Sequence, residues 1–429
     1  MRILWVKVGG LWPLNTGGRL RSFHILSELS RHHPVTLLTT HGPDDDPEEL
    51  PRRLPHCRGV RSMPATLPKR GSARFVGALL RSWLSSLPLD INKCRVPDLR
   101  RTAQRIIRAG ECDVCVADFL AAVPNVPLEG AVPVVLFSHN VEHLIWRRLS
   151  RIEGRGWRRA LLELEWRKMR RFEAQACSRV NLTIAVSEDD RRLLAANAPR
   201  ALVHALPTGV DSSYFTPNGY QENATGLVFT GSMDWYPNED AILHFIHTIL
   251  PGIQREVPEV SMTVVGRNPR PSLRQAATAA GIRVTGTVQD VRPYVAEAAV
   301  YVVPLRAGGG TRLKIFEALA MGKAVVSTTV GAEGLPLVSG EHFVRADDPA
   351  EFARAVVSLL RDPARRRALG MAGRHLVEQR YSWAQVAREF ETHLEGVRRA
   401  NNHGDRPTIH DAARPAPRLD AGADSFPGW

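Results

Sequence analysis

The chain has 429 residues, and 57 Lys and Arg residues against 44 Asp and Glu residues give it a formal net charge of +13. A single hydrophobic core stops growing at about 250–300 residues, so the length predicts two domains of roughly 150–200 residues each. A hydrophobic content of 44% excludes a wholly disordered chain. No apolar run approaches the roughly 20 residues that span a bilayer, and no signal-peptide pattern follows Met1, so we expect a cytoplasmic protein.

Short apolar runs rich in Val, Ile and Leu alternate with segments of helical period along the chain. In the first half, the strand-like runs are residues 3–8, 35–39, 114–117, 132–137, 182–186 and 202–205. In the second half, they are residues 227–230, 261–265, 282–285, 300–303, 324–327 and 342–344. Helical patterns lie between them, for example at 19–31, 239–256 and 311–321. This alternation is typical of parallel sheets that are buried on both faces, so the sequence predicts two doubly wound, Rossmann-like α/β domains.

Pro and Gly residues in the segment LPTGVDSSYFTP mark the junction between the two patterns. We therefore expect one domain at residues 1–206 and a second at 207–378. Residues 379–398 contain an amphipathic helical pattern and form a separate C-terminal helix in this prediction. Residues 399–429 are rich in Pro, Gly, Asp and Arg and lack periodicity, which predicts a disordered tail.

The excess of positive charge is concentrated in residues 144–180, where eleven Arg and Lys residues face four Glu residues and three tryptophans are interleaved. The apolar spacing predicts a long amphipathic helical region with a basic face. Such a composition is expected at a membrane surface, but it also fits a core-packing helix whose basic face is solvated. No nucleic-acid-binding module is visible, so we expect no nucleic acid partner.

A glycine turn followed by a helix is the strongest single signal for a ligand site. Gly308, Gly309 and Gly310 follow a predicted strand, and Thr311 opens the helix. Backbone N–H groups at such a turn and the positive end of the helix dipole bind phosphate. The helix also carries Arg312 and Lys314 as cations and Glu317 as an acceptor for ribose hydroxyl groups.

Many collinear segments of the chain resemble the family 4 retaining glycosyltransferases, which have the GT-B fold. The segments are GGRLRSFHILSELSRHHPVTLLT, LFSHNVEH, VSEDDRRLL, LPTGVDSSYFTP, GSMDWYPNEDAILHF, GTVQDVRPYV and LKIFEALAMGKAVVS. The similarity extends to about residue 397. It implies an acceptor-side N-terminal domain, a C-terminal domain that binds the nucleotide-sugar, and a final helix that returns to the first domain.

The resemblance also implies roles for individual residues. Gly17 and Gly18 lie near the donor phosphates, and His139 lies near the transferred sugar as the catalytic-site histidine. The turn with Thr311 binds the diphosphate, Glu317 binds the ribose, and Val288 lies beside the base. The implied reaction moves a hexose-type sugar, with retention, from a nucleotide-diphosphate donor to a glycan, a lipid-linked or a natural-product acceptor. UDP is favoured over GDP on family frequency, and neither a cofactor nor a metal is expected.

Two departures from the family pattern indicate a divergent branch. The first glutamate of the family's pair is absent, because Gly309 stands eight residues before Glu317. The segment GSMDWYPN also lacks the basic residues that often follow the first strand of the second domain. Arg312 and Lys314 are the candidates to supply that charge to the phosphates.

Two alternatives remain open at this point. The sequence from His139 to His143 fits an HxxEH zinc hydrolase, with Glu142 as the base. The missing glutamate also leaves room for a protein that binds a sugar nucleotide without turning it over.

Overall fold

Two parallel β-sheets organise the chain. The computed structural model describes residues 1–14, 16–43, 45–65, 82, 85–217, 219, 221–307 and 313–403. The first sheet has the order β3 (Gly59–Pro64), β2 (Val35–His41), β1 (Ile3–Lys7), β4 (Val114–Asp118), β5 (Val134–Ser138), β6 (Leu182–Ala185) and β7 (Val203–Ala205). The second has the order β10 (Arg283–Val284), β9 (Ser261–Val265), β8 (Asn223–Thr230), β11 (Ala298–Val303), β12 (Ala324–Ser327) and β13 (Val344–Arg345). Every neighbouring pair is parallel, which confirms the predicted pair of doubly wound sheets.

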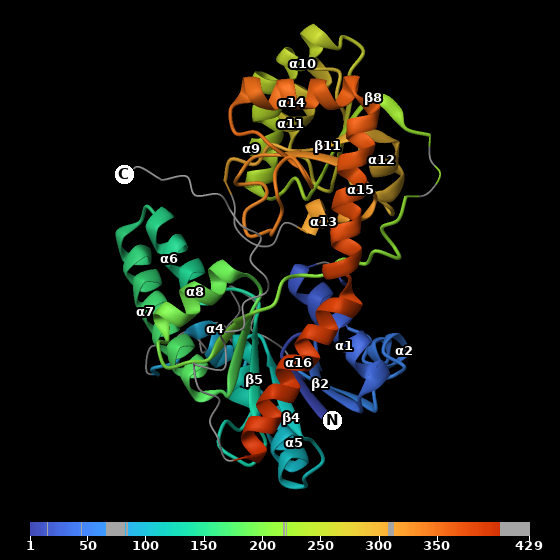
Figure 1. Ribbon diagram of the computed structural model, residues 1–429. Coiled ribbons are helices and arrows are strands. Elements are labelled where there is room, and N and C mark those ends of the chain that lie inside the picture. Colours follow the sequence, from blue (N-terminus) through green and yellow to red (C-terminus); the bar gives the residue numbers. More distant parts are fainter. Residues whose placement is uncertain are drawn as a thin grey trace.

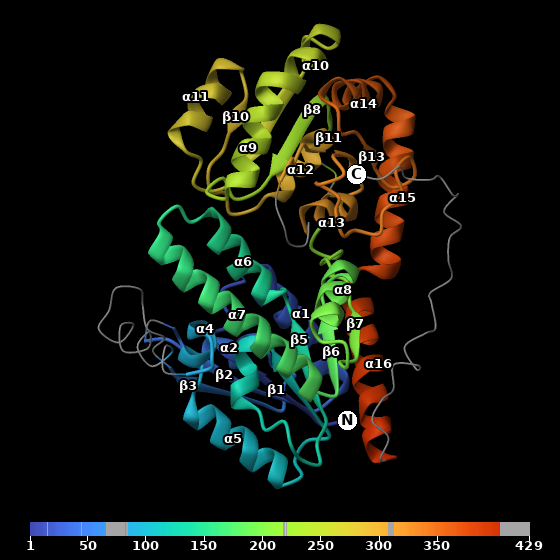
Figure 2. The same ribbon diagram turned by 90° about the vertical axis from the view of Figure 1, so that its left-hand side faces the viewer.

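Helices cover both faces of each sheet, as its continuous apolar strands require. Around the first sheet lie α1 (Gly17–His32), α2 (Glu49–Arg53), α4 (Leu89–Lys93), α5 (Pro97–Arg108), the 3₁₀ helix η1 (Leu120–Asn125), α6 (Glu142–Ile152), α7 (Gly156–Arg179) and α8 (Glu188–Asn197). Around the second lie α9 (Tyr236–His244), η2 (Phe245–Ile249), α10 (Leu250–Glu256), α11 (Pro271–Ala279), α12 (Arg292–Glu297), α13 (Leu313–Ala320), α14 (Pro349–Arg361) and α15 (Pro363–Arg380). Figures 1 and 2 show the second domain stacked above the first.

The final helix, α16 (Trp383–Asn402), belongs to the second half of the sequence but packs on the first sheet. Its Trp383, Val386 and Phe390 side chains are buried in the same core cluster as Trp5 of β1. The centroids of the Phe390 and Trp5 rings lie 5.5 Å apart, and α16 packs along α1. The return of this helix to the first domain, which the family resemblance implied, is therefore present.

The chain crosses between the domains twice, and the two crossings touch. The Val210 N–H group donates to the Tyr381 carbonyl at 2.8 Å, and Val210 forms a β-bridge with Ser382. A methyl group added at Gly209 would lie 2.5 Å from the Trp383 ring, so no larger residue fits there without movement. This paired crossing fixes where the second domain is attached.

The structure corrects three details of the sequence prediction. The edge strand β3 was not predicted, because its sequence GVRSMP is mostly half-buried and lacks a clear apolar run. The expected helix at 239–256 starts at Tyr236 and contains the π-helical turn η2 just before Pro251, which has no N–H group for an α-helical hydrogen bond. The basic region at 144–180 is not one long helix: α6 and α7 fold back on each other around Gly154.

Helix α16 brings His393 next to His204 of β7, with their Nδ1 atoms 3.2 Å apart. Burial lowers the pKa of both histidines, that of His393 to about 4, and the neighbouring His204 lowers the pKa of His393 further. In the unfolded chain, the histidine pKa is about 6.5. Between these values the unfolded state binds more protons than the folded state, so the free energy of unfolding falls as the pH is lowered.

We therefore predict that the melting temperature drops between pH 7 and pH 5, and that the drop is smaller in a His393→Leu variant. Thermal unfolding followed by circular dichroism at both pH values measures this difference. An equal drop in the variant and the wild type would show that this pair does not control acid stability.

Candidate active site

The strand order reverses between β1 and β4 in the first sheet and between β8 and β11 in the second. In open parallel sheets, ligands bind outside the carboxyl ends of the strands at such a reversal. A methyl group added at Gly17, which begins α1, would lie 3.7 Å from the Leu313 side chain, which begins α13. The two reversal points therefore face each other across the junction of the domains, where the start of α1 lies close to the start of α13.

Asp118, at the end of β4, is the centre of a buried polar cluster in the first domain. Its carboxylate accepts hydrogen bonds from Lys7 Nζ at 3.1 Å and from Trp5 Nε1 at 3.0 Å, both in β1. A third bond joins its other oxygen to His139 Nε2 at 2.7 Å. Burial alone would raise the pKa of Asp118, but the charge of Lys7 and the bonds from His139 and Trp5 outweigh burial and hold the pKa below its ordinary value. Asp118 is therefore a fixed negative charge at the β1/β4 reversal.

His139 follows β5 and has both ring nitrogens engaged. The Arg21 guanidinium of α1 lies 3.0 Å from His139 Nδ1, and a guanidinium can only donate, so Nδ1 accepts and Nε2 carries the proton that Asp118 accepts. Burial is the main cause that lowers the pKa of His139 to about 4, and the positive charges of Arg21 and Lys7 lower it further. Asp118 raises this pKa but does not outweigh them. At neutral pH the imidazole is uncharged and held in one tautomer.

Phe119 forms the surface above this cluster. Its backbone has φ of 72°, a conformation that is rare for a bulky residue and that often marks a functional site. The ring stacks on His139 with centroids 3.8 Å apart, and Lys7 Nζ lies 4.0 Å from its centre. A methyl group added at Gly18 would lie 2.3 Å from Phe119 Cζ, so Gly18 allows α1 to begin directly against this ring.

In the second domain, α13 carries the predicted donor-binding side chains Lys314 and Glu317. Lys314 Nζ donates to Asn238 Oδ1 at 2.9 Å and lies 4.1 Å from the centre of the Phe229 ring at the end of β8. Glu317 is half-buried, and burial raises its pKa to about 7, with Lys314 opposing the rise. The Glu317 charge also adds to the effect of burial in raising the pKa of Tyr301, so this carboxylate lies close to β11.

The other predicted donor residues are described only in part. Val288 lies between β10 and α12 and packs, partly buried, against the core beside β11. Gly308, Gly309, Gly310, Thr311 and Arg312 lie outside the described residues, so the predicted phosphate turn itself stays a prediction. The segment that follows it, from Leu313, begins α13 at the β8/β11 reversal.

The sequence prediction missed Asp118, Lys7, Arg21 and Phe119. Two signals were present in the sequence: Lys7 interrupts an otherwise apolar first strand, and Asp118 directly follows the apolar run of β4. What the sequence could not supply is the strand order, which makes β1 and β4 neighbours.

The two histidines of the HxxEH pattern do not converge. His143 Nδ1 is hydrogen-bonded to the buried carboxylate of Glu173, whereas His139 is held by Asp118 and Arg21. Helix α6 begins only at Glu142, so helical spacing does not place the two histidines on one face. Within the described part of the chain, no three His, Cys, Asp or Glu residues are grouped as metal ligands.

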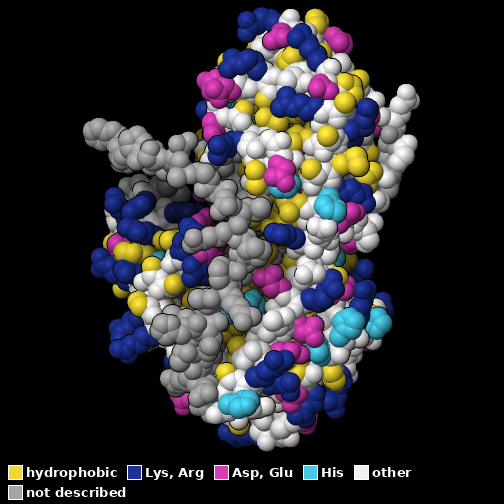
Figure 3. Space-filling model, in the orientation of Figure 1, with side chains coloured by type: hydrophobic (Ala, Val, Ile, Leu, Met, Phe, Trp, Pro, Cys, Tyr) yellow, Lys and Arg dark blue, Asp and Glu magenta, His cyan; other side chains and the backbone are white. Residues whose placement is uncertain are grey.

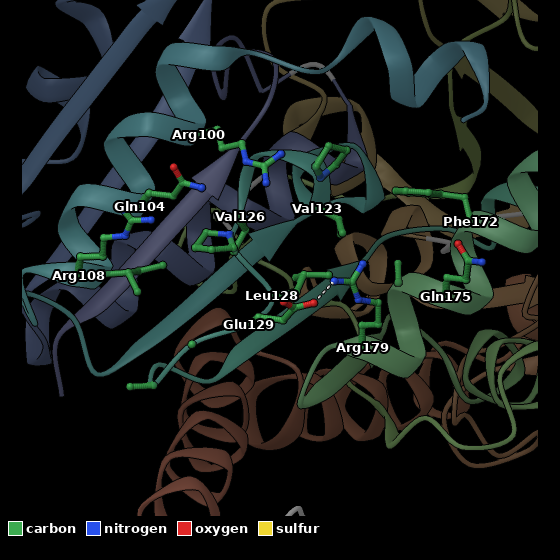
Figure 4. Close-up of a pocket in the computed structure, with 16 residues that line it drawn as sticks. Arg100, Gln104, Arg108, Val123, Val126, Leu128, Glu129, Phe172, Gln175 and Arg179 are labelled. Carbon is green, nitrogen blue, oxygen red and sulfur yellow. Dashed lines mark hydrogen bonds and ion pairs between the residues drawn. The ribbon is translucent and has the colours of Figure 1, made fainter. Parts of the chain in front are cut away.

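A cavity of about 750 Å³ lies elsewhere, between α5, the loop after η1 and the end of α7 (Figure 4). This loop leads into the amino end of β5, so the cavity is at the sheet edge opposite to the Asp118 cluster. Arg179 donates to Glu129 at 2.8 Å across one side of it. Its position separates it from both strand-order reversals.

Two family models match this chain, one described as Glycosyltransferase Family 4 over residues 17–214 and one as Glycosyl transferases group 1 over residues 224–362. The chain belongs to the family 4 glycosyltransferases. Solved structures support the GT-B fold of this family member. Anabaena HepE in complex with UDP and glucose is 15% identical, with a TM-score of 0.61 over 92% of this chain and 100% of that chain. Sucrose-phosphate synthase from Thermosynechococcus elongatus is 16% identical, with a TM-score of 0.63 over 93% of this chain and 99% of that chain.

Curated relatives include a phosphatidyl-myo-inositol mannosyltransferase of Mycobacterium leprae, which is 32% identical over 201 residues, or 44% of this chain and 53% of that protein. A GDP-mannose-dependent alpha-(1-6)-phosphatidylinositol monomannoside mannosyltransferase of Mycolicibacterium smegmatis is 27% identical over 234 residues, or 49% of this chain and 60% of that protein. The chain thus spans about half the length of the curated relatives that it matches.

The buried Asp118 charge yields a stability prediction for this family 4 protein. An Asp118→Asn substitution leaves Lys7 buried without its counter-charge, and breaking a buried pair in this way costs about 3–5 kcal/mol. Urea unfolding measures the cost. Because Lys7→Met removes the other charge, the double variant should lose less stability than the sum of the two single variants; strict additivity would contradict the coupling.

Proposed function

We propose that this chain is a retaining glycosyltransferase that moves a hexose-type sugar from a nucleotide-diphosphate donor to a glycan, a lipid-linked or a small-molecule acceptor. The observation that carries this proposal is the close approach of Gly17 to Leu313, since a methyl group added at Gly17 would lie 3.7 Å from the Leu313 side chain. It places the start of α1 in the first domain against the start of α13 in the second, at both strand-order reversals. Family membership supports the reaction class, and this arrangement supports the junction as the proposed location of the donor.

The chemistry of the proposed reaction needs positive charge and oriented dipoles at the leaving diphosphate. As the bond from the anomeric carbon to the phosphate oxygen breaks, negative charge builds on the diphosphate, and groups already oriented toward it lower the barrier. The amino end of α13 and the Lys314 ammonium group lie on the second-domain side of the junction. We assign to them the electrostatic role that basic residues after β8 would otherwise fill.

His139 enters this proposal as a positioning group rather than a proton acceptor. Its two ring nitrogens are occupied by Asp118 and Arg21, and its lowered pKa makes it a poor base. The stacked Phe119 and His139 rings instead give the first-domain side of the junction a rigid surface. The sugar would be oriented against this surface while the diphosphate accepts the proton of the acceptor hydroxyl group.

The donor base is a separate part of the proposal. Family frequency favours UDP, whereas two of the curated relatives carry GDP-mannose in their names. Both donors therefore belong in the first assays. The acceptor named for the mycobacterial relatives is a phosphatidyl-myo-inositol, which makes a lipid-linked acceptor the first class to test here.

The ribose role of Glu317 predicts a pH-dependent donor affinity. A carboxylate with a pKa of about 7 becomes a strong hydrogen-bond acceptor only as the pH rises through that value. The affinity for the nucleotide-sugar should therefore rise roughly tenfold from pH 6 to pH 8. In Glu317→Gln the affinity should fall about 10- to 100-fold at pH 8 and lose its pH dependence.

Calorimetric titration of the donor at both pH values measures these affinities, and release of nucleoside diphosphate measures turnover. Glu297→Gln, at the exposed end of α12, is the matched control and should behave as the wild type. Unchanged affinity in Glu317→Gln would contradict the ribose assignment. Tight donor binding without release of the diphosphate, with any acceptor class, would favour the non-catalytic alternative.

A further inference from the structure

Helices α6 and α7 form an antiparallel hairpin at the edge of the first domain (Figure 2). The base of the hairpin is anchored, since Met169, Glu173 and Cys177 of α7 are buried and Glu173 accepts a hydrogen bond from the Glu142 N–H group at 2.7 Å. Around the turn at residues 153–155 the side chains are mostly exposed. The hairpin is thus fixed at one end and presents its turn to the surroundings.

Large apolar side chains are exposed along both helices of this hairpin. Ile145 and Leu149 lie one turn apart on α6, and Trp157 and Leu164 lie two turns apart on α7. Trp157 is 64% exposed. These four are part of a set of only ten large hydrophobic side chains that are exposed in the described part of the protein. Exposed apolar residues at helical spacing on one motif indicate a contact surface rather than scattered surface residues.

Seven exposed arginines surround these apolar side chains: Arg147, Arg148, Arg151, Arg155, Arg158, Arg159 and Arg167. Carboxylates offset little of this charge. Glu165 is buried and accepts a hydrogen bond from the Leu89 N–H group at 2.7 Å, and Glu163 pairs with Arg167 at 3.6 Å. Among the ion pairs of the described residues, none involves the other six arginines. Figure 3 shows dark-blue and yellow side chains intermingled at its left edge, over this hairpin.

We propose that this hairpin surface, formed by the four apolar side chains and the seven arginines, docks on an anionic lipid bilayer. Tryptophan and aliphatic side chains enter the headgroup region, and arginines bind lipid phosphates, which is the combination that interfacial amphipathic helices use. A single-stranded nucleic acid would account for the arginines, but Ile145, Leu149 and Leu164 would have no role in binding it. No described helix is long and apolar enough to cross a bilayer, so the proposed contact is at the surface.

The position of the hairpin gives the docking a consequence for the reaction. Helix α6 begins three residues after His139, so the hairpin rises directly from the carboxyl edge of the first sheet. Docking would hold the junction of the two domains beside the bilayer surface, where a lipid-linked acceptor presents its hydroxyl group. This consequence rests on the proposed transferase function; the lipid binding itself does not.

Cosedimentation of the full chain with vesicles tests the proposal. We expect binding to vesicles that contain about one third phosphatidylglycerol in phosphatidylcholine, and at least tenfold weaker binding to pure phosphatidylcholine vesicles. The double variant Trp157→Ser/Leu164→Ser should bind the anionic vesicles at least fivefold more weakly. The variant Arg155→Glu/Arg159→Glu should do the same, and its remaining binding should depend less on salt concentration.

Met371→Ser is the matched control, because Met371 on α15 is 71% exposed and far from the hairpin in sequence and fold. Equal vesicle binding by the wild type and both double variants would overturn the proposal. A preference for RNA would also overturn it. In that case the wild type would bind a single-stranded RNA oligonucleotide more strongly than the anionic vesicles in the same buffer, and the arginine variant alone would bind the RNA more weakly.

The same samples separate this proposal from the transferase function. Circular dichroism establishes that each variant is folded, and release of nucleoside diphosphate with a water-soluble acceptor measures turnover. Failure of the docking proposal leaves this turnover intact while vesicle binding is absent or unchanged by the substitutions. Failure of the proposed function abolishes turnover in the wild type itself, whatever its binding to vesicles.

Discussion

The buried carboxylate of Asp118 is the interaction on which the arrangement of the first domain depends. It joins β1, through Trp5 and Lys7, to His139 after β5, across the point where the strand order reverses. A buried charge is tolerated only when its partners are complete, and here three donors satisfy it. The side chains that line the reversal are therefore fixed before any ligand arrives, which is the condition for electrostatic preorganisation.

The same residue network connects the site to the joint between the domains. Trp5 donates to Asp118 from one edge of its ring and packs against Phe390 of α16. Helix α16 in turn starts at Trp383, whose ring lies against Gly209 in the other crossing segment. The His24 ring of α1 stacks on Trp383 with centroids 5.0 Å apart. A series of packed rings thus links this paired crossing to the Asp118 cluster.

The sheets could be predicted well from the sequence because a parallel strand that is buried on both faces consists of a continuous run of apolar residues. Residues 261–265 and 324–327 match β9 and β12 in full. The approach failed at β3, an edge strand with little apolar content, and at the basic region, where helical spacing continued through the turn around Gly154. Periodicity reports the local conformation of a segment, not the point at which a chain reverses.

The site was harder to predict than the fold for a similar reason. Glu317 and Lys314 could be predicted as donor-binding residues because they follow a glycine turn in one continuous segment. Asp118, Lys7 and Arg21 come from three elements, with Lys7 and Asp118 111 residues apart, and only the order β1–β4–β5 brings them together. The pairing of strands is a property of the whole sheet, so single residues at strand ends carry no sign of their neighbours.

The central claim of this account is that the junction of the two domains binds a nucleotide-diphosphate sugar without a metal ion. The most direct test is the melting temperature of the full chain with UDP-, GDP-, ADP- and dTDP-sugars, each with and without a chelator. A ligand at about 100 times its dissociation constant stabilises a protein by about 2.7 kcal/mol, which is a readily measured shift. The account predicts an upward shift with one nucleotide that the chelator leaves unchanged. If no nucleotide-sugar shifts the melting temperature, or if the chelator abolishes the shift, the claim is contradicted.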